Sequence, residues 1–213
     1  MRVTKDTITP HHYVSFISVL LFIAVVTFTL PKQYASAAQA RVPKLRNTQI
    51  ISAPNSNYAP GHGRKIDTVV IHFMSAINVD QARWADPKLN EQILQDNGVS
   101  AHYLIDRAGT TYRLVSEQNV AWHAGGSIMP PPDNRRNVNS FSIGIELIAT
   151  KDSGYTEAQY QALSTLLHDI KSRCPIHHIV GHDEISGSRA VRMGLRGDLK
   201  EDPGPLFDWS RVR

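Results

Sequence analysis

The sequence is poor in the features that mark disulfide-bonded, nucleic-acid-binding and repeat proteins. It has a single cysteine, Cys174, so no intrachain disulfide can form. That residue lies between a helical pattern and Pro175, which favours a small buried apolar side chain over a thiol nucleophile. There is no internal repeat and no basic run interleaved with aromatic residues, so a nucleic-acid partner is not expected.

Charge and composition are those of an ordinary globular protein. The 213 residues have a net charge of +4, and the first 40 carry three basic side chains and one acidic side chain, so the rest retains +2. Hydrophobic residues make up 41% of the chain and charged residues 20%. A chain of this length and composition can bury the core of one domain and still carry extra segments.

Residues 1–40 have the pattern of a targeting segment. Arg2 and Lys5 give a positive start, an apolar run follows from about residue 13 to residue 30, and residues 35–37 (Ala-Ser-Ala) resemble a cleavage site. The run is slightly long for a signal peptide, so an uncleaved membrane anchor is the alternative. Either interpretation predicts export, to the periplasm or the extracellular cell envelope.

The remaining chain alternates strand and helix patterns. Residues 41–65 are rich in proline, asparagine, serine and glycine, and are expected to be a lead-in lying over a domain of residues 66–213. Strands are predicted at 66–73, 142–148 and 177–181, a hairpin at 100–107 and 111–115, and helices at about 88–96 and from Thr156 to Cys174. This order predicts an α/β fold with a central mixed sheet flanked by helices.

Three residues at strand or loop ends suit a metal ion. His72 ends the first apolar strand, His182 follows the last one, and Asp202 precedes Pro203 in a Pro-Gly-Pro corner. A strand-end histidine alone more often has a core or capping role. Two of them with an aspartate restricted by proline favour a shared Zn²⁺, which takes imidazole and carboxylate ligands.

Glu146 lies in the middle of an otherwise apolar strand, residues 143–148. A carboxylate in apolar surroundings needs a partner or a raised pKa. It either faces solvent or acts as a general base beside the metal.

Six motifs identify a family. IDTVVIHF, SAHYLIDRAGT, AWHAGG, NSFSIGIEL, IVGH and KEDPGPLFDW occur in the order found in zinc-dependent N-acetylmuramoyl-L-alanine amidases of the second amidase family. The chain resembles this family over about residues 51–209. The resemblance implies the fold of peptidoglycan recognition proteins, with a zinc site at the sheet's edge in a surface cleft. It also implies hydrolysis of the amide bond between the lactyl group of muramic acid and L-alanine.

The resemblance assigns roles to seven residues and implies one zinc ion per chain. The zinc ligands are His72, His182 and Asp202, the catalytic residues are Glu146 and Lys200, and the substrate-binding residues are Trp122 and His123. Peptidoglycan or muropeptides are the expected partners of a monomer, without a membrane partner beyond the possible anchor. Two alternatives remain: a recognition protein that binds muropeptides without cutting them, and a zinc hydrolase of the same fold acting on another amide.

One segment departs from the family pattern. An insertion between His182 and Asp202 roughly doubles the usual spacing and carries Arg189, Arg192 and Arg196. The simpler interpretation is a solvated loop. The alternative hypothesis is that these arginines line the mouth of the cleft and bind carboxylates of the stem peptide, because arginine pairs with carboxylates bidentately.

Overall fold

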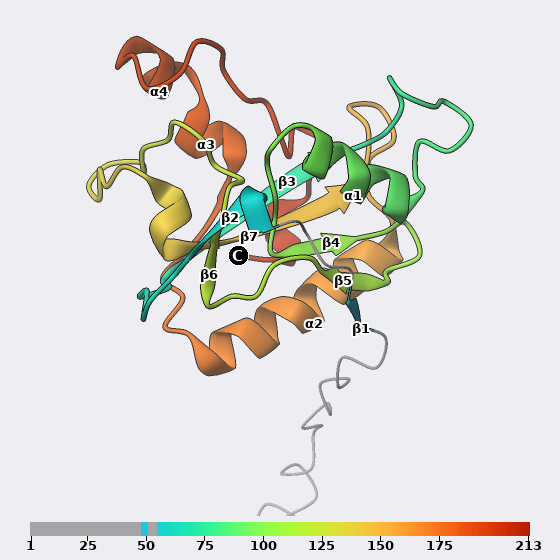
Figure 1. Cartoon of the computed structure of the whole chain (residues 1–213), viewed down its shortest axis with the longest axis horizontal. Helices are drawn as coiled ribbons and strands as arrows, with labels where there is room; N and C mark the ends of the chain where they lie inside the picture. Colours follow the sequence, from blue (N-terminus) through green and yellow to red (C-terminus); the bar gives the residue numbers. More distant parts are fainter. Residues whose placement is uncertain (1–47, 51–54) are drawn as a thin grey trace, which may run out of the picture. The chain divides into compact units, whose positions relative to one another are not determined.

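A six-stranded mixed β-sheet forms the centre of the molecule in the computed structural model, which describes residues 48–50 and 55–213 (Figure 1). The strand order is β1-β5-β4-β7-β3-β8, and a separate two-stranded sheet pairs β2 with β6. The strands are β1 (Thr48–Ile50), β2 (Tyr58–Pro60), β3 (Thr68–Met74), β4 (Tyr103–Ile105), β5 (Thr111–Arg113), β6 (Asn119–Ala121), β7 (Ser142–Ile148) and β8 (His178–Gly181). The helices are α1 (Pro87–Asp96), α2 (Glu157–Arg173), α3 (His182–Ser186) and α4 (Ser188–Arg192), with 3₁₀ turns η2 (Asn55–Asn57), η3 (Val138–Phe141) and η4 (Trp209–Arg211). The predicted mixed sheet is confirmed.

The central strands β3 and β7 run parallel over seven residue pairs, and β8 extends the parallel pairing on the other side of β3. The predicted hairpin is present as the antiparallel pair β4 and β5. In the β3–β7 register, His72 lies opposite Glu146. Parallel neighbours in register project on the same face of a sheet, so these two side chains are adjacent.

The two faces of the sheet follow the alternation of side chains along each strand. Val69 and Ile71 of β3, with Ile143, Ile145 and Leu147 of β7, pack against helix α2 in the largest apolar cluster. The residues between them therefore project to the opposite face, where α1, α3 and the loops lie (Figure 1). His72 and Glu146 belong to this second face.

Helix α2 begins with the capping box expected from the sequence. The Thr156 hydroxyl accepts a hydrogen bond from the Gln159 backbone N–H, and the Gln159 side chain accepts one from the Thr156 N–H. The buried Gln159 amide also donates to the carbonyl oxygens of Ile105 and Ile148, at 3.3 Å and 3.0 Å. One side chain thus caps the helix and ties it to β4 and β7.

An ion pair holds the other end of α2. Arg173 donates to both carboxylate oxygens of Glu117, and the Tyr103 hydroxyl donates to the same carboxylate at 2.6 Å. Burial raises the pKa of Glu117, but these hydrogen bonds outweigh it and hold the pKa below its ordinary value.

The segment expected to be a lead-in contributes strands. β1 pairs in parallel with β5 at the edge of the main sheet, and β2 pairs with β6. Three-residue strands that join a sheet through backbone hydrogen bonds need no alternating apolar pattern, so the composition of residues 41–65 did not reveal them. The targeting pattern of residues 1–40 lies outside the described residues.

Within residues 48–50 and 55–213, none of the helices has the length and apolar composition needed to cross a membrane.

Candidate metal centre

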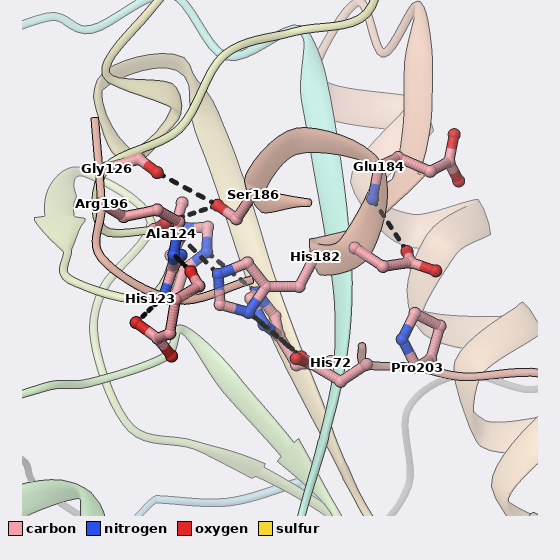
Figure 2. A network of polar contacts seen from close by, with 12 residues as sticks. His72, His123, Ala124, Gly126, His182, Glu184, Ser186, Arg196 and Pro203 are labelled. Atoms are coloured by element: carbon pink, nitrogen blue, oxygen red, sulfur yellow. Dashed lines mark hydrogen bonds and ion pairs between the residues drawn. The ribbon is translucent and has the colours of Figure 1, made fainter. Parts of the chain in front are cut away.

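Three side chains from different parts of the sequence converge on one point, and Figure 2 shows the two histidines among them, His72 and His182, side by side. His72 Nδ1, His182 Nδ1 and Asp202 Oδ2 lie 3.1 Å from one another in all three pairs. The two histidines are buried, and the Asp202 side chain is 14% exposed. Ligand atoms about 2.0–2.1 Å from a tetrahedral zinc ion lie about 3.3 Å apart, so the observed spacing fits such an ion.

Different elements position the three groups. His72 is the fifth residue of β3, and His182 is the first residue of α3, directly after β8. Asp202 follows the insertion, and its carbonyl oxygen accepts a hydrogen bond from the Asp183 N–H at 2.9 Å. The insertion folds as α3, α4 and a return segment, so it does not keep Asp202 away from the two histidines.

The protonation of this cluster indicates that it would hold a cation. Burial, reinforced by the charge of the neighbouring His182, lowers the pKa of His72 to about 4, so its ring is neutral near pH 7. The Nε2 of His182 lies 3.3 Å from the carbonyl oxygen of Ala124, which can only accept a hydrogen bond. Nε2 of His182 therefore carries a proton and donates it to Ala124, and Nδ1 is the nitrogen that faces the Asp202 carboxylate. Nδ1 of His72, Nδ1 of His182 and the Asp202 carboxylate all point at one another, and a metal ion bound between them would satisfy all three.

Glu146 lies beside this cluster as a buried carboxylate with an unsatisfied oxygen. It is 7% exposed, and its Oε2 has no hydrogen-bond partner in the described part of the chain. Burial and then the charge of Asp202 raise the pKa of Glu146 well above its ordinary value, while Lys200 opposes the shift. The carboxylate thus lies in the cavity rather than on a solvent-facing side of the sheet.

A cavity of ≈ 340 Å³ opens beside the cluster. Lys200 lines it, and among residues 55–213 the Lys200 side chain takes part in no hydrogen bond or ion pair. Trp122 also lines the cavity and is 37% exposed, so the wall offers an aromatic surface. The cavity therefore presents a free ammonium group and an aromatic ring close to the three converging ligand atoms.

His123 is buried more deeply than a residue that forms the wall of a cleft. It borders the cavity but is only 8% exposed, and its Nδ1 lies 3.1 Å from Nε2 of His72. Its contact with His72 makes it a neighbour of the cluster that could hold a metal. The adjacent motif histidine, His102, is fully buried and accepts a hydrogen bond from the Gly144 N–H at 3.0 Å, which is a structural role.

The arginines of the insertion do not act as a group. Of the three, Arg196 lines the cavity, and its buried Nη1 has no hydrogen-bond partner within residues 55–213. Arg189 donates to the carbonyl oxygen of Met129 at 2.8 Å, and Arg192 is exposed on α4 outside the cavity lining. The hypothesis of three arginines at the cleft mouth is therefore reduced to Arg196, because the short helix α4 turns the other two away.

Sequence reasoning missed the residues that hold the loop of the AWHAGG motif. The Asn139 side-chain oxygen accepts hydrogen bonds from the backbone N–H groups of His123 and Ala124, at 3.1 Å and 2.8 Å. Asn139 stands in the NSFSIGIEL motif, just before β7, but nothing in its spacing predicts contact with a loop sixteen residues earlier.

Comparisons with known proteins agree with the motif order. A family model described as N-acetylmuramoyl-L-alanine amidase matches residues 62–205, which include all the candidate site residues. The 1,6-anhydro-N-acetylmuramyl-L-alanine amidase AmpD of Citrobacter freundii is 41% identical over 117 residues, which are 54% of this chain and 56% of that protein. The N-acetylmuramoyl-L-alanine amidase AmiD of Escherichia coli is 36% identical over 137 residues, 56% of this chain and 45% of that protein. The chain thus spans about half the length of these curated relatives.

Solved structures show the same similarity in three dimensions. A crystal structure of a selenomethionine derivative of AmpD matches with a TM-score of 0.62 and 31% identity, covering 79% of this chain and 93% of that one. AmpDh3 from Pseudomonas aeruginosa, in complex with an anhydromuramic pentapeptide, matches with a TM-score of 0.53 and 28% identity, covering 70% and 58%.

These relatives also correct the expectation of an exported protein. The AmpD proteins of Citrobacter freundii, Escherichia coli and Haemophilus influenzae are cytoplasmic muropeptide amidases. The predicted periplasmic or envelope location is therefore wrong. It depended on a compositional pattern, a basic start and an apolar run in residues 1–40, and such a pattern carries less weight than the similarity to these relatives.

Proposed function

Because the chain belongs to the N-acetylmuramoyl-L-alanine amidase family, we propose that it hydrolyses the amide bond between the muramic acid lactyl group and L-alanine. One observation carries the proposal: the cluster of His72, His182 and Asp202 has beside it the Glu146 carboxylate, whose Oε2 has no hydrogen-bond partner among residues 55–213. We propose that residues 66–213 form the catalytic domain and that residues 41–65 form its lead-in.

We propose that His72, His182 and Asp202 hold one zinc ion. Three protein ligands are the usual number in catalytic zinc sites, which leave a further position open. Bound there, zinc would supply Lewis acidity, polarising the scissile carbonyl group and making water more acidic.

In the proposed reaction, Glu146 transfers the proton and Lys200 stabilises the developing negative charge. Glu146 accepts the proton of the attacking water, whose oxygen bonds to the lactyl carbonyl carbon. The carbon–nitrogen bond breaks, and Glu146 delivers the proton to the nitrogen of the departing L-alanine. Lys200, whose side chain takes part in no hydrogen bond or ion pair within residues 55–213, stabilises the negative charge on the carbonyl oxygen in the transition state. Trp122 offers a surface on which the substrate can pack.

The names of the relatives point to the first substrates to test. AmpD is named for 1,6-anhydro-N-acetylmuramyl-L-alanine, and AmpDh3 was solved with an anhydromuramic pentapeptide. We therefore propose muropeptides with 1,6-anhydromuramic acid as substrates, with intact peptidoglycan as the comparison.

Mass spectrometry of the reaction products tests the function directly. The full chain is incubated with each substrate, with a chelator, and with a chelator followed by Zn²⁺. Free peptides beginning with L-alanine should appear, disappear on chelation and return with zinc. Binding without released peptide would support the recognition-protein alternative, and cleavage at another bond would refute the proposed specificity.

A further inference from the structure

His123 forms the middle of a buried chain of hydrogen bonds that begins at the metal-binding cluster. Its Nδ1 lies 3.1 Å from Nε2 of His72, and its Nε2 lies 3.2 Å from the Ser142 hydroxyl. That hydroxyl lies 2.7 Å from the carbonyl oxygen of Val138. His123, His72 and Ser142 are all less than 9% exposed, so water does not compete for these contacts.

The carbonyl oxygen of Val138, at the end of this series of hydrogen bonds, determines which group donates and which accepts at each step. A carbonyl oxygen only accepts, so the single hydroxyl proton of Ser142 is donated to Val138. Ser142 must then accept from Nε2–H of His123, which leaves a lone pair on Nδ1 of His123. His72 therefore donates its Nε2–H to His123, and its own Nδ1 lone pair points toward His182 and Asp202.

The loop that contains His123 also contacts His182, the second histidine of the cluster. Nε2 of His182 donates to the carbonyl oxygen of Ala124, the residue after His123 (Figure 2). Asn139 holds the backbone of both loop residues. Gly144 makes room for the imidazole ring, because a Cβ atom at that position would lie 2.4 Å from Cγ of His123.

We propose that His123 is a positioning residue that keeps His72 in the tautomer with a free Nδ1, and that residues 123–124 set both metal-binding histidines through their Nε2–H groups. This inference rests on the proposed zinc site. It reassigns His123 from substrate contact to an action through His72. Groups that orient a metal-binding histidine in this way typically change metal affinity by about 10–100-fold when they are removed.

Two variants of nearly the same shape separate hydrogen bonding from packing. In His123→Asn the amide oxygen occupies approximately the place of Nδ1 and can still accept from His72, whereas His123→Leu has the same branching and no acceptor. His168→Gln, an exposed exchange on α2, is the control. Zinc affinity of each full-length protein is measured by competition with a chromogenic chelator at constant pH.

We expect His123→Leu to lower zinc affinity by about 10–100-fold, and His123→Asn to stay within a few-fold of the original protein. Equal losses in the two variants would mean that only ring packing matters and would overturn the proposal, as would equal retention. If the unsubstituted protein binds no zinc, the proposed metal site fails instead, so the two failures are distinguishable.

A measurement on the unsubstituted, zinc-free protein does not depend on how the variants fold. Nitrogen-15 chemical shifts distinguish protonated from unprotonated ring nitrogens, and the His72 signals can be assigned by their absence in His72→Ala. A protonated Nε2 and an unprotonated Nδ1 are expected. A protonated Nδ1 would overturn the proposal.

Discussion

Replacing Glu146 by glutamine should separate the catalytic use of this carboxylate from its effect on stability. The substitution keeps the shape of the side chain and removes its ability to take a proton. Glu146 is 7% exposed and its Oε2 has no hydrogen-bond partner among the residues that the structure describes, so the ionised carboxylate is incompletely hydrogen-bonded in the fold. The variant should therefore be less active and more stable.

The magnitudes follow from these two roles. Loss of a general acid–base group typically lowers kcat by about 10²–10⁴-fold, and KM should change little because Glu146 acts on the attacking water. Removing a buried, unsatisfied charged oxygen should raise the free energy of unfolding by about 1–3 kcal/mol. For a chain of this size that corresponds to about 2–4 °C in Tm per kcal/mol.

The stability difference should also depend on pH with a definite sign. Burial raises the pKa of Glu146 in the folded state above the ordinary value of 4.5, so the folded protein binds the proton more tightly than the unfolded chain. Stability therefore falls as pH rises above about 4.5, and the glutamine variant lacks this loss. The difference in free energy of unfolding between Glu146→Gln and the original protein should therefore be small at pH 4 and grow toward pH 8.

Kinetics of peptide release and urea unfolding of the zinc-free proteins test both parts. Glu91→Gln, which alters another buried glutamate on α1 outside the cavity lining, is the kinetic control and should keep full turnover. Turnover of the zinc-bound Glu146 variant within about tenfold of the original would refute the acid–base role. Equal unfolding free energies at pH 8 would refute the inference that the carboxylate destabilises the fold.

Three further changes have expected outcomes. Gly144→Ala should push the His123 ring aside and weaken zinc binding by about tenfold or more in chelator competition, and unchanged affinity would contradict the close packing. Arg196→Ala should raise KM by about tenfold for muropeptides with free carboxylates, whereas Arg192→Ala should not, and equal effects would argue against a specific contact. Glu117→Gln should reduce the loss of stability on acidification below about pH 4.5, because the hydrogen bonds that lower the pKa of Glu117 stabilise the fold only while its carboxylate is charged. Urea unfolding between pH 3 and 6 measures this difference.

Local pattern was sufficient for the longer elements. Strand β7 has the bounds that its apolar run predicts, and α2 begins at the predicted capping box. The alternation of strands and helices predicted a mixed sheet because parallel strands need crossover connections. The motif order was enough to identify the family and to name His72, His182 and Asp202 as candidates for one site.

Contacts between residues that are far apart in the sequence could not be predicted from local pattern. The register that places His72 beside Glu146 depends on how two strands separated by about seventy residues align, and neither strand encodes that alignment alone. The short strands of residues 48–50 and 58–60 form through backbone pairing, which leaves little trace in composition.

The sequence by itself therefore determined the longer elements, the family and the residue types available for a metal centre. Only the tertiary structure decided that His123 contacts His72, which nitrogen each histidine presents, and that Arg196 is the one of the three inserted arginines that lines the cavity. The physical reason is that hydrophobic periodicity is a local property, whereas the tautomer of a buried histidine is set by whichever donors and acceptors the fold brings against both of its nitrogens.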